Sequence, residues 1–188
     1  RVYTPDGERE VSKEEIAVKG TCGNNQSLHV TVNRSSKISP PPFMAGMAEV
    51  EIDKETGSIE VVDYVAVVDC GTPVNPNLAR VQTEGGLAQG IGMALYEDIQ
   101  YNEKGQMRNN SFMQYKIPCR QDVKKIRVEF APSYEKSHPF GAKSIGEIVI
   151  NTPCPAIANA VYNAVGLRIK ETPITSEKIA MGLLENKI

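Results

Sequence analysis

The sequence lacks the features that identify several large classes of protein. It has no basic block and no interleaving of aromatic with basic residues, which are the usual signs of nucleic-acid binding. It has no apolar run near the roughly 20 residues that a membrane-spanning helix requires. The formal net charge is only -2. We therefore expect no nucleic-acid partner and no membrane span.

Cysteine is scarce, and its spacing does not fit the usual metal sites. The four cysteines, Cys22, Cys70, Cys119 and Cys154, are far apart and form no C-x-x-C pair. Zinc sites and iron–sulfur clusters need closely spaced Cys or His ligands, so we predict no metal ligand from side chains. Unpaired thiols are typical of an intracellular protein, and we expect a cytoplasmic location.

The length and the order of elements favour an α+β fold. A chain of 188 residues is long enough to bury a real core in one domain. Predicted strands and helices do not alternate regularly, and no internal repeat is evident, which argues against a doubly wound sheet. We expect a mixed sheet with β-hairpins, packed against a long glycine-rich helix and two C-terminal helices. Residues 1–188 form one domain in this interpretation, with 1–42 as an irregular lead-in.

The lead-in carries several short signals. Asp6-Gly7 predicts a hairpin turn, and Ser12 followed by Glu15 is typical of a helix start. We expect a glycine- and asparagine-rich loop over residues 20–26, a short strand over 28–33 and a connecting loop over 35–42.

Alternating residues predict the sheet. Residues 49–53 and 58–61 form a hairpin with one buried face, and the second strand continues through 64–68, which is apolar on both faces and therefore central. A second hairpin turns at 103–105. Further strands are expected at 112–117 and 126–130, and residues 148–150 are strand-like.

Asn75-Pro76 begins the long helix, and Thr152-Pro153 and Thr175-Ser176 begin the two shorter ones. We expect Gly166 to end the first of the shorter helices. Each glycine in the long helix costs roughly 1 kcal/mol against alanine, which indicates close approach by another backbone or by a ligand. One stripe of that helix holds Leu78, Val81, Gly85, Ala88, Gly92 and Leu95.

Two segments carry candidate chemistry. Gln82, Gly86 and Gln89 share a helix face on which amides lie beside a glycine notch, an arrangement suited to a planar heterocycle. Gly146-Glu147 places a carboxylate in a glycine-containing turn behind Lys143. Taken alone, the residues leave open a packed helix with surface glutamines and a solvated turn glutamate.

The motifs taken together resemble one family. Asp69-Cys70-Gly71, Asn75-Pro76, Gln82-Thr83-Glu84-Gly85, Gln89-Gly90-Ile91-Gly92 and Lys143-Ser144-Ile145-Gly146-Glu147 occur in the order found in the molybdenum-binding subunit of the xanthine dehydrogenase and aldehyde oxidase family. Each motif is weak alone, but their joint order is specific. The resemblance runs from about residue 43 to 175.

The resemblance implies roles for these residues. Glu147 matches the family's catalytic base, which takes a proton from the water-derived oxygen that attacks the substrate carbon. Gln82 matches a glutamine that contacts the pterin. The remaining candidate cofactor contacts are Lys143, Gly85, Gly86, Gln89 and Gly146.

The resemblance also implies cofactors and partners. It predicts a molybdenum–pterin cofactor, either molybdopterin or its cytosine dinucleotide form, with FAD and iron–sulfur clusters on partner domains or subunits. The family's other cofactor loops lie upstream of such a segment. We therefore expect this chain to be the C-terminal part of a longer subunit, paired with its N-terminal half and inactive alone.

Three hypotheses remain at this point. The first is part of a molybdenum hydroxylase acting on a purine or another N-heterocycle. The second is a family member that oxidises an aldehyde or carbon monoxide. The third is a non-catalytic, stand-alone assembly or interaction domain.

Overall fold

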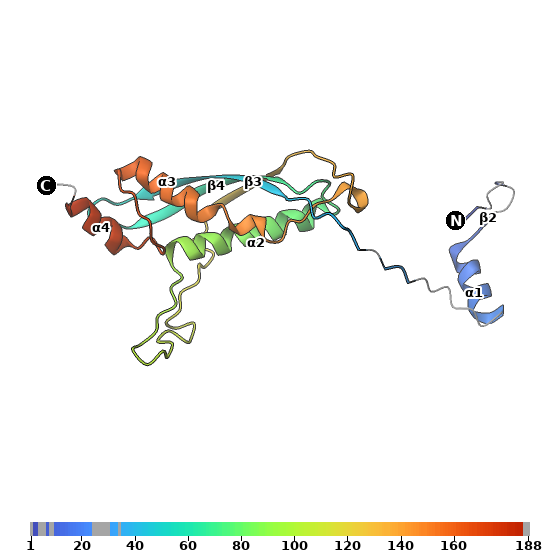
Figure 1. The fold of residues 1–188 in the computed structure, drawn as a ribbon, viewed down its shortest axis with the longest axis horizontal. Helices are drawn as coiled ribbons and strands as arrows, with labels where there is room; N and C mark the ends of the chain where they lie inside the picture. The colour runs from blue at the N-terminus through green and yellow to red at the C-terminus, as the bar shows by residue number, and fades with distance from the viewer. Residues whose placement is uncertain (1, 4–6, 8–9, 24–30, 34, 186–188) are drawn as a thin grey trace. The chain divides into compact units, whose positions relative to one another are not determined.

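The computed structural model describes residues 2–3, 7, 10–23, 31–33 and 35–185. These residues belong to two compact units, Arg1–Lys37 and Ile38–Ile188, which are considered separately (Figure 1). Among the helices of the described residues, none combines the length and the apolar character needed to cross a membrane.

The N-terminal unit contains a small hairpin and a helix. Strands β1 (Val2–Tyr3) and β2 (Glu10–Val11) pair antiparallel, which confirms the predicted hairpin. Helix α1 (Lys13–Gly23) begins as predicted, with the Glu15 N–H donating to Ser12 Oγ at 3.0 Å. The loop predicted over 20–26 is wrong at its start, because α1 continues to Gly23. Residues 24–26 and 28–30 of the predicted loop and strand lie outside the described residues, and 31–33 have no regular structure.

The second unit is built on a mixed three-stranded sheet. Strand β3 (Phe43–Ile52) pairs antiparallel with β4 (Ile59–Asp69), and β4 pairs parallel with β5 (Lys125–Phe130). The order β3-β4-β5 confirms the predicted central position of β4. Parallel pairing requires a long connection, which helix α2 and the arm after it supply (Figure 1).

Helix α2 (Pro76–Leu95) begins at the predicted cap, where the Leu78 N–H donates to Asn75 Oδ1 at 3.1 Å. The predicted stripe does not coincide with the buried face, since Leu78 and Val81 are 66% and 64% exposed. The physical reason is that the large side chains of α2 that are fully buried in the core, Leu87 and Ile91, lie outside the predicted stripe. The buried face consists of Thr83, Gly86, Leu87, Gly90, Ile91, Gly92, Ala94 and Leu95.

The arm between α2 and β5 contains the second predicted hairpin, marked by a single antiparallel bridge between Tyr101 and Met107. The strand predicted over 112–117 is wrong, because these residues form turns and irregular structure. Phe112 and Met113 are 80% and 85% exposed, so the apolar side chains that suggested a strand do not pack on the sheet.

The strand-like run 148–150 is also corrected. It forms a short 3-10 helix, η2 (Ile148–Ile150), because Val149 is buried against α2 instead of pairing with a strand. A second 3-10 helix, η1 (Pro139–Gly141), precedes it in the chain.

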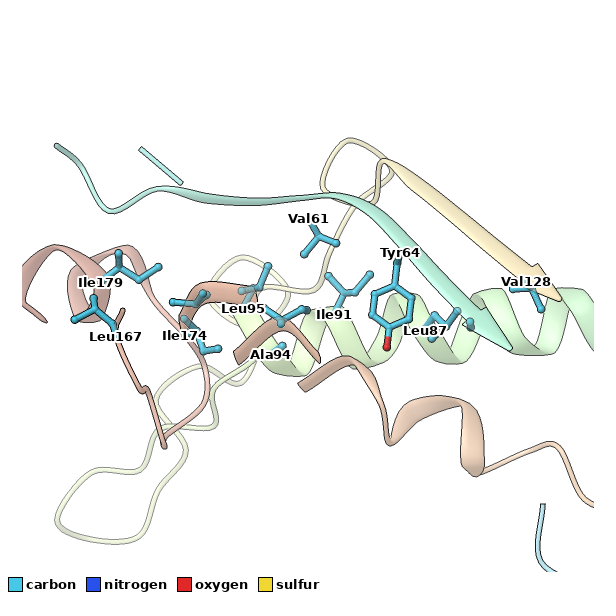
Figure 2. Close-up of a cluster of buried hydrophobic side chains, with 13 residues drawn as sticks. Val61, Tyr64, Leu87, Ile91, Ala94, Leu95, Val128, Leu167, Ile174 and Ile179 are labelled. Carbon is cyan, nitrogen blue, oxygen red and sulfur yellow. The ribbon is translucent and has the colours of Figure 1, made fainter. Parts of the chain in front are cut away.

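Two C-terminal helices complete the core, as predicted. Helix α3 (Pro153–Val165) ends at Gly166, which has a φ of 75°, and α4 (Ser176–Glu185) follows Thr175. Thr152 does not cap α3 with its side chain, because its Oγ1 accepts a hydrogen bond from the Tyr64 hydroxyl at 2.8 Å. Figure 2 shows part of the resulting core, in which side chains of the central strand meet those of α2 and the C-terminal segments.

Candidate functional site

A cavity of about 730 Å³ lies between α2 and the segment that contains η2. Two stretches of sequence that are far apart in the chain form its walls. The lining residues are Val81, Gln82, Gly85, Gly86, Gln89, Gly146, Glu147, Ile150 and Asn151.

The α2 wall presents two amides and an open position between them. Gln82 and Gln89 lie on the same side of the helix, seven residues apart, and both are exposed. The structure gives neither side chain a hydrogen bond to another described residue. A Cβ atom added to Gly85 would meet nothing within 4 Å. This wall therefore offers hydrogen-bonding groups beside free space.

The facing wall presents a carboxylate. Glu147 directly precedes η2 and is exposed, and within the described part of the chain its carboxylate has no hydrogen bond or ion pair. Gly146 also has open space at its Cβ position. Gly86, in contrast, is a packing glycine, because a Cβ there would overlap Cγ2 of Val149. The Gly86–Val149 contact sets the distance between the two walls.

Lys143 has a different setting from the other predicted site residues. Its ammonium donates to Asp69 Oδ2 at 2.6 Å, its side chain is only 8% exposed, and the Phe43 ring lies 5.1 Å from Nζ. It lines a neighbouring cavity of about 470 Å³, which shares Gln82 and Gly146 with the first one. The structure thus gathers every other predicted site residue around one cavity and places Lys143 beside it.

The electrostatics of Asp69 follow from its partners. The Lys143 ammonium, the Ser133 hydroxyl and the Gly71 N–H all donate to this carboxylate, which lowers its pKa to about 2, against the opposing effect of partial burial. Asp69, the last residue of β4, is therefore ionised at neutral pH, and its carboxylate is held by these three donors.

Backbone pairing holds the Lys143 segment to the end of β4. The Lys143 N–H donates to the Cys70 carbonyl at 2.7 Å, and Gly71 forms an antiparallel bridge with Ala142. Gly71 has a φ of 67°, and a Cβ there would overlap the Gly141 carbonyl oxygen. These contacts place the Asp-Cys-Gly and Lys-Ser-Ile-Gly-Glu motifs side by side.

Sequence reasoning missed several residues of the site. Val81, Ile150 and Asn151 line the cavity, and Asn151 adds an exposed amide next to η2. Asp69 was noticed only as part of a motif. The available signal was its place two residues before a glycine at the end of a buried strand, where a carboxylate often accepts a local backbone N–H.

The arrangement of the described residues can do two things chemically. Amides from α2 can hydrogen-bond a planar polar ligand, and the carboxylate across the cavity can accept a proton from it. No group of three or more His, Cys, Asp or Glu side chains that could hold a metal ion occurs within the described part of the chain.

Comparison with known proteins gives a consistent result. Residues 2–124 match the family model described as the molybdopterin cofactor-binding domain. The chain is 39% identical over 178 residues to the probable hypoxanthine oxidase XdhD of Escherichia coli strain K12, covering 93% of this chain and 18% of that protein. It is 31% identical over 176 residues to the aldehyde oxidoreductase molybdenum-binding subunit PaoC of the same strain, covering 93% of this chain and 24% of PaoC.

A solved structure shows the same fold. The reconstituted CO dehydrogenase from Oligotropha carboxidovorans matches with a TM-score of 0.71 and 28% identity, over 77% of this chain and 18% of that one. The chain therefore spans less than a quarter of the length of each of these relatives. With a family model that covers most of its length, the chain belongs to the molybdenum hydroxylases, as a molybdopterin cofactor-binding domain.

Proposed function

We propose that this chain forms one wall of the active site of a molybdenum hydroxylase that inserts water-derived oxygen into an electron-poor carbon of a purine or another N-heterocycle. The observation that carries the proposal is the cavity that brings Gln82, Gln89 and Glu147 together from two distant segments. The N-heterocycle is favoured because identity to the probable hypoxanthine oxidase is 39%, against 31% to the aldehyde oxidoreductase subunit.

The residues around the cavity fit a molybdenum–pterin cofactor. Gly85 and Gly146 leave their Cβ positions open, so packing among the described residues does not require glycine there. The exposed amides of Gln82 and Gln89 can hydrogen-bond the polar edge of a pterin, whether in molybdopterin or in its cytosine dinucleotide form. When bound, the cofactor supplies the two-electron oxidation and the activation of water.

Glu147 acts as the general base in this proposal. Its carboxylate faces the cavity from the wall opposite the amides, and it takes the proton from the oxygen nucleophile as that oxygen attacks the substrate. Gly86 and Val149 keep this wall at a fixed distance from α2, so the base is oriented before substrate arrives.

The remaining walls come from partners in this proposal. The N-terminal half of the molybdenum subunit closes the pocket, and iron–sulfur and FAD domains or subunits carry the electrons away. An aldehyde- or carbon monoxide-oxidising enzyme is the second candidate, supported by the similarity to PaoC and to the CO dehydrogenase structure.

The test is Glu147→Gln in the complete enzyme, assayed with hypoxanthine, quinoline and an aromatic aldehyde. We expect turnover to fall by about 10²–10⁴-fold with unchanged molybdenum content, because loss of a general base removes that much rate. Glu177→Gln, on the exposed first turn of α4, is the matched control. Near-normal turnover of fully loaded Glu147→Gln enzyme would refute the role of Glu147, and the preferred substrate decides between the two candidates.

A further inference from the structure

We propose that Asp69 and Lys143 form a positioning pair that holds Glu147 in the cavity, and that Lys143 affects the reaction only through Glu147. The inference rests on the proposed function of Glu147. It replaces the cofactor contact that the family resemblance suggested for Lys143 with a role fixed by contacts inside this chain.

The Asp69–Lys143 ion pair is held in one orientation by several contacts. Lys143 Nζ lies 2.6 Å from Asp69 Oδ2, and the two side chains are 8% and 23% exposed. Asp69 also accepts from the Ser133 hydroxyl and from the Gly71 N–H, so its orientation is set from three directions. The Lys143 backbone is held separately, by its N–H to the Cys70 carbonyl at 2.7 Å. Side chain and backbone of Lys143 are thus both tied to the end of β4.

Lys143 precedes the proposed base, Glu147, by four residues. Between them, Ser144 and Gly146 are exposed, and Gly146 has open space at its Cβ position. After the base, Val149 packs into the notch at Gly86. Glu147 is therefore in a short exposed segment that is anchored at both ends. Loss of the Asp69–Lys143 ion pair leaves this end of the segment held by backbone hydrogen bonds alone, so the Lys143 side chain no longer fixes its position.

The same contacts argue against a direct cofactor contact by Lys143. Its ammonium is engaged with Asp69 and lies over the Phe43 ring, and its side chain does not line the cavity that contains Glu147. The Asp69 carboxylate takes one of the three ammonium donors and offsets the positive charge, which weakens the attraction of Lys143 for an anionic ligand group.

The experiment uses the complete enzyme with Lys143→Met, Asp69→Asn and the double variant. We expect each single variant to lower kcat by about 10–100-fold with little change in KM or molybdenum content, since misplacement of a reacting group by about 1 Å has an effect of that size. The double variant leaves no unpaired buried charge, and its kcat should be no lower than that of Lys143→Met. If a single variant fails to fold, the double variant replaces it, with the same expected fall in kcat of about 10–100-fold relative to wild type.

The decisive measurement repeats Lys143→Met in the Glu147→Gln background. Because Lys143 acts through Glu147, the second substitution should then change kcat by less than about twofold, as expected when two residues act as one unit. Arg127→Met is the control, since it breaks the 2.7 Å ion pair between Arg127 of β5 and Asp63 of β4, neither of which lines the cavity, and should leave kcat unchanged.

Two results would overturn the positioning role. One is a molybdenum content that falls in proportion to activity in Lys143→Met, which would mean a direct cofactor contact. The other is a full effect of Lys143→Met in the Glu147→Gln background. Neither result resembles the failure of the proposed function, which would appear as normal turnover in Glu147→Gln alone.

Discussion

Val149 occupies the space beside Gly86 that any larger residue at position 86 would need. A Cβ atom on Gly86 would overlap both Cγ2 and Cβ of Val149, whereas a Cβ on the neighbouring Gly85 would meet nothing within 4 Å. Among the described residues, packing therefore explains the glycine at position 86 but not the glycine at position 85.

This difference predicts opposite effects of two alanines on residues 1–188. Gly86→Ala should destabilise the chain by about 1–3 kcal/mol, because η2 must move away from α2. Gly85→Ala should stabilise it by up to about 1 kcal/mol through helix propensity. Urea unfolding measures both. In the complete enzyme, Gly85→Ala should lower molybdenum content if the cofactor approaches this position. Equal stability of the two variants would contradict the packing role of Gly86.

Gln82→Leu should reduce cofactor retention in the complete enzyme. A polar group of a buried pterin would lose its partner, at about 1–3 kcal/mol, so purified protein should contain less molybdenum and pterin. Metal analysis and pterin fluorescence measure this. Gln121→Leu is the control, because Gln121 is exposed and does not line the cavity. Unchanged content in Gln82→Leu would make Gln82 only a surface residue of α2.

Asp69 should make stability depend on pH in the acid range. Its pKa is about 2 in the folded chain and 3.8 without its partners, so its contribution is present above about pH 3.8 and is lost as the pH falls through 2. The shift corresponds to roughly 2 kcal/mol at most. The difference in unfolding free energy between wild type and Asp69→Asn should therefore shrink from pH 5 to pH 2. A constant difference would mean that the carboxylate charge is unimportant.

Residues 1–188 expressed alone should fold without cofactor and lack hydroxylase activity. The core is complete around the central strand, with side chains such as Tyr64, Leu87 and Ile157 fully buried. A ligand at the cavity would touch only one wall and lose much of the burial that small-molecule sites provide. The chain is expressed in a host that makes molybdopterin. Circular dichroism then measures folding, and the purified protein is assayed for molybdenum content and for oxidation of hypoxanthine. Stoichiometric molybdenum with turnover would contradict it.

Local signals in the sequence predicted most of the fold. The caps at Ser12 and Asn75, the turn glycines and the apolar run of β4 depend on neighbouring residues, and the structure confirms the elements that they mark. The predictions failed where packing between distant segments determines the local structure. Residues 148–150 have a strand-like composition, but they form a 3-10 turn in which Val149 packs against Gly86 of α2.

The candidate site was only partly predictable for the same reason. The motif order indicated Glu147 and Gln82 together, and the structure places both at one cavity. The ion pair of Lys143 with Asp69 spans 74 positions, and no spacing rule connects a lysine with a carboxylate so far away. The motif marks Lys143 as a candidate residue, but its partner, Asp69, is determined by the folded chain.

The Asp69–Lys143 pair also affects which ligands this wall attracts. Among the described residues that line the cavity, Glu147 is the one with an ionisable side chain, and the charge of the nearby Lys143 ammonium is offset by Asp69. The local field is therefore negative. An anion that approaches this wall meets repulsion from Glu147, so we expect phosphate groups of a cofactor to be bound by cations elsewhere in the enzyme. Neutral heterocycles and aldehydes meet no such barrier, and their capture should depend little on ionic strength.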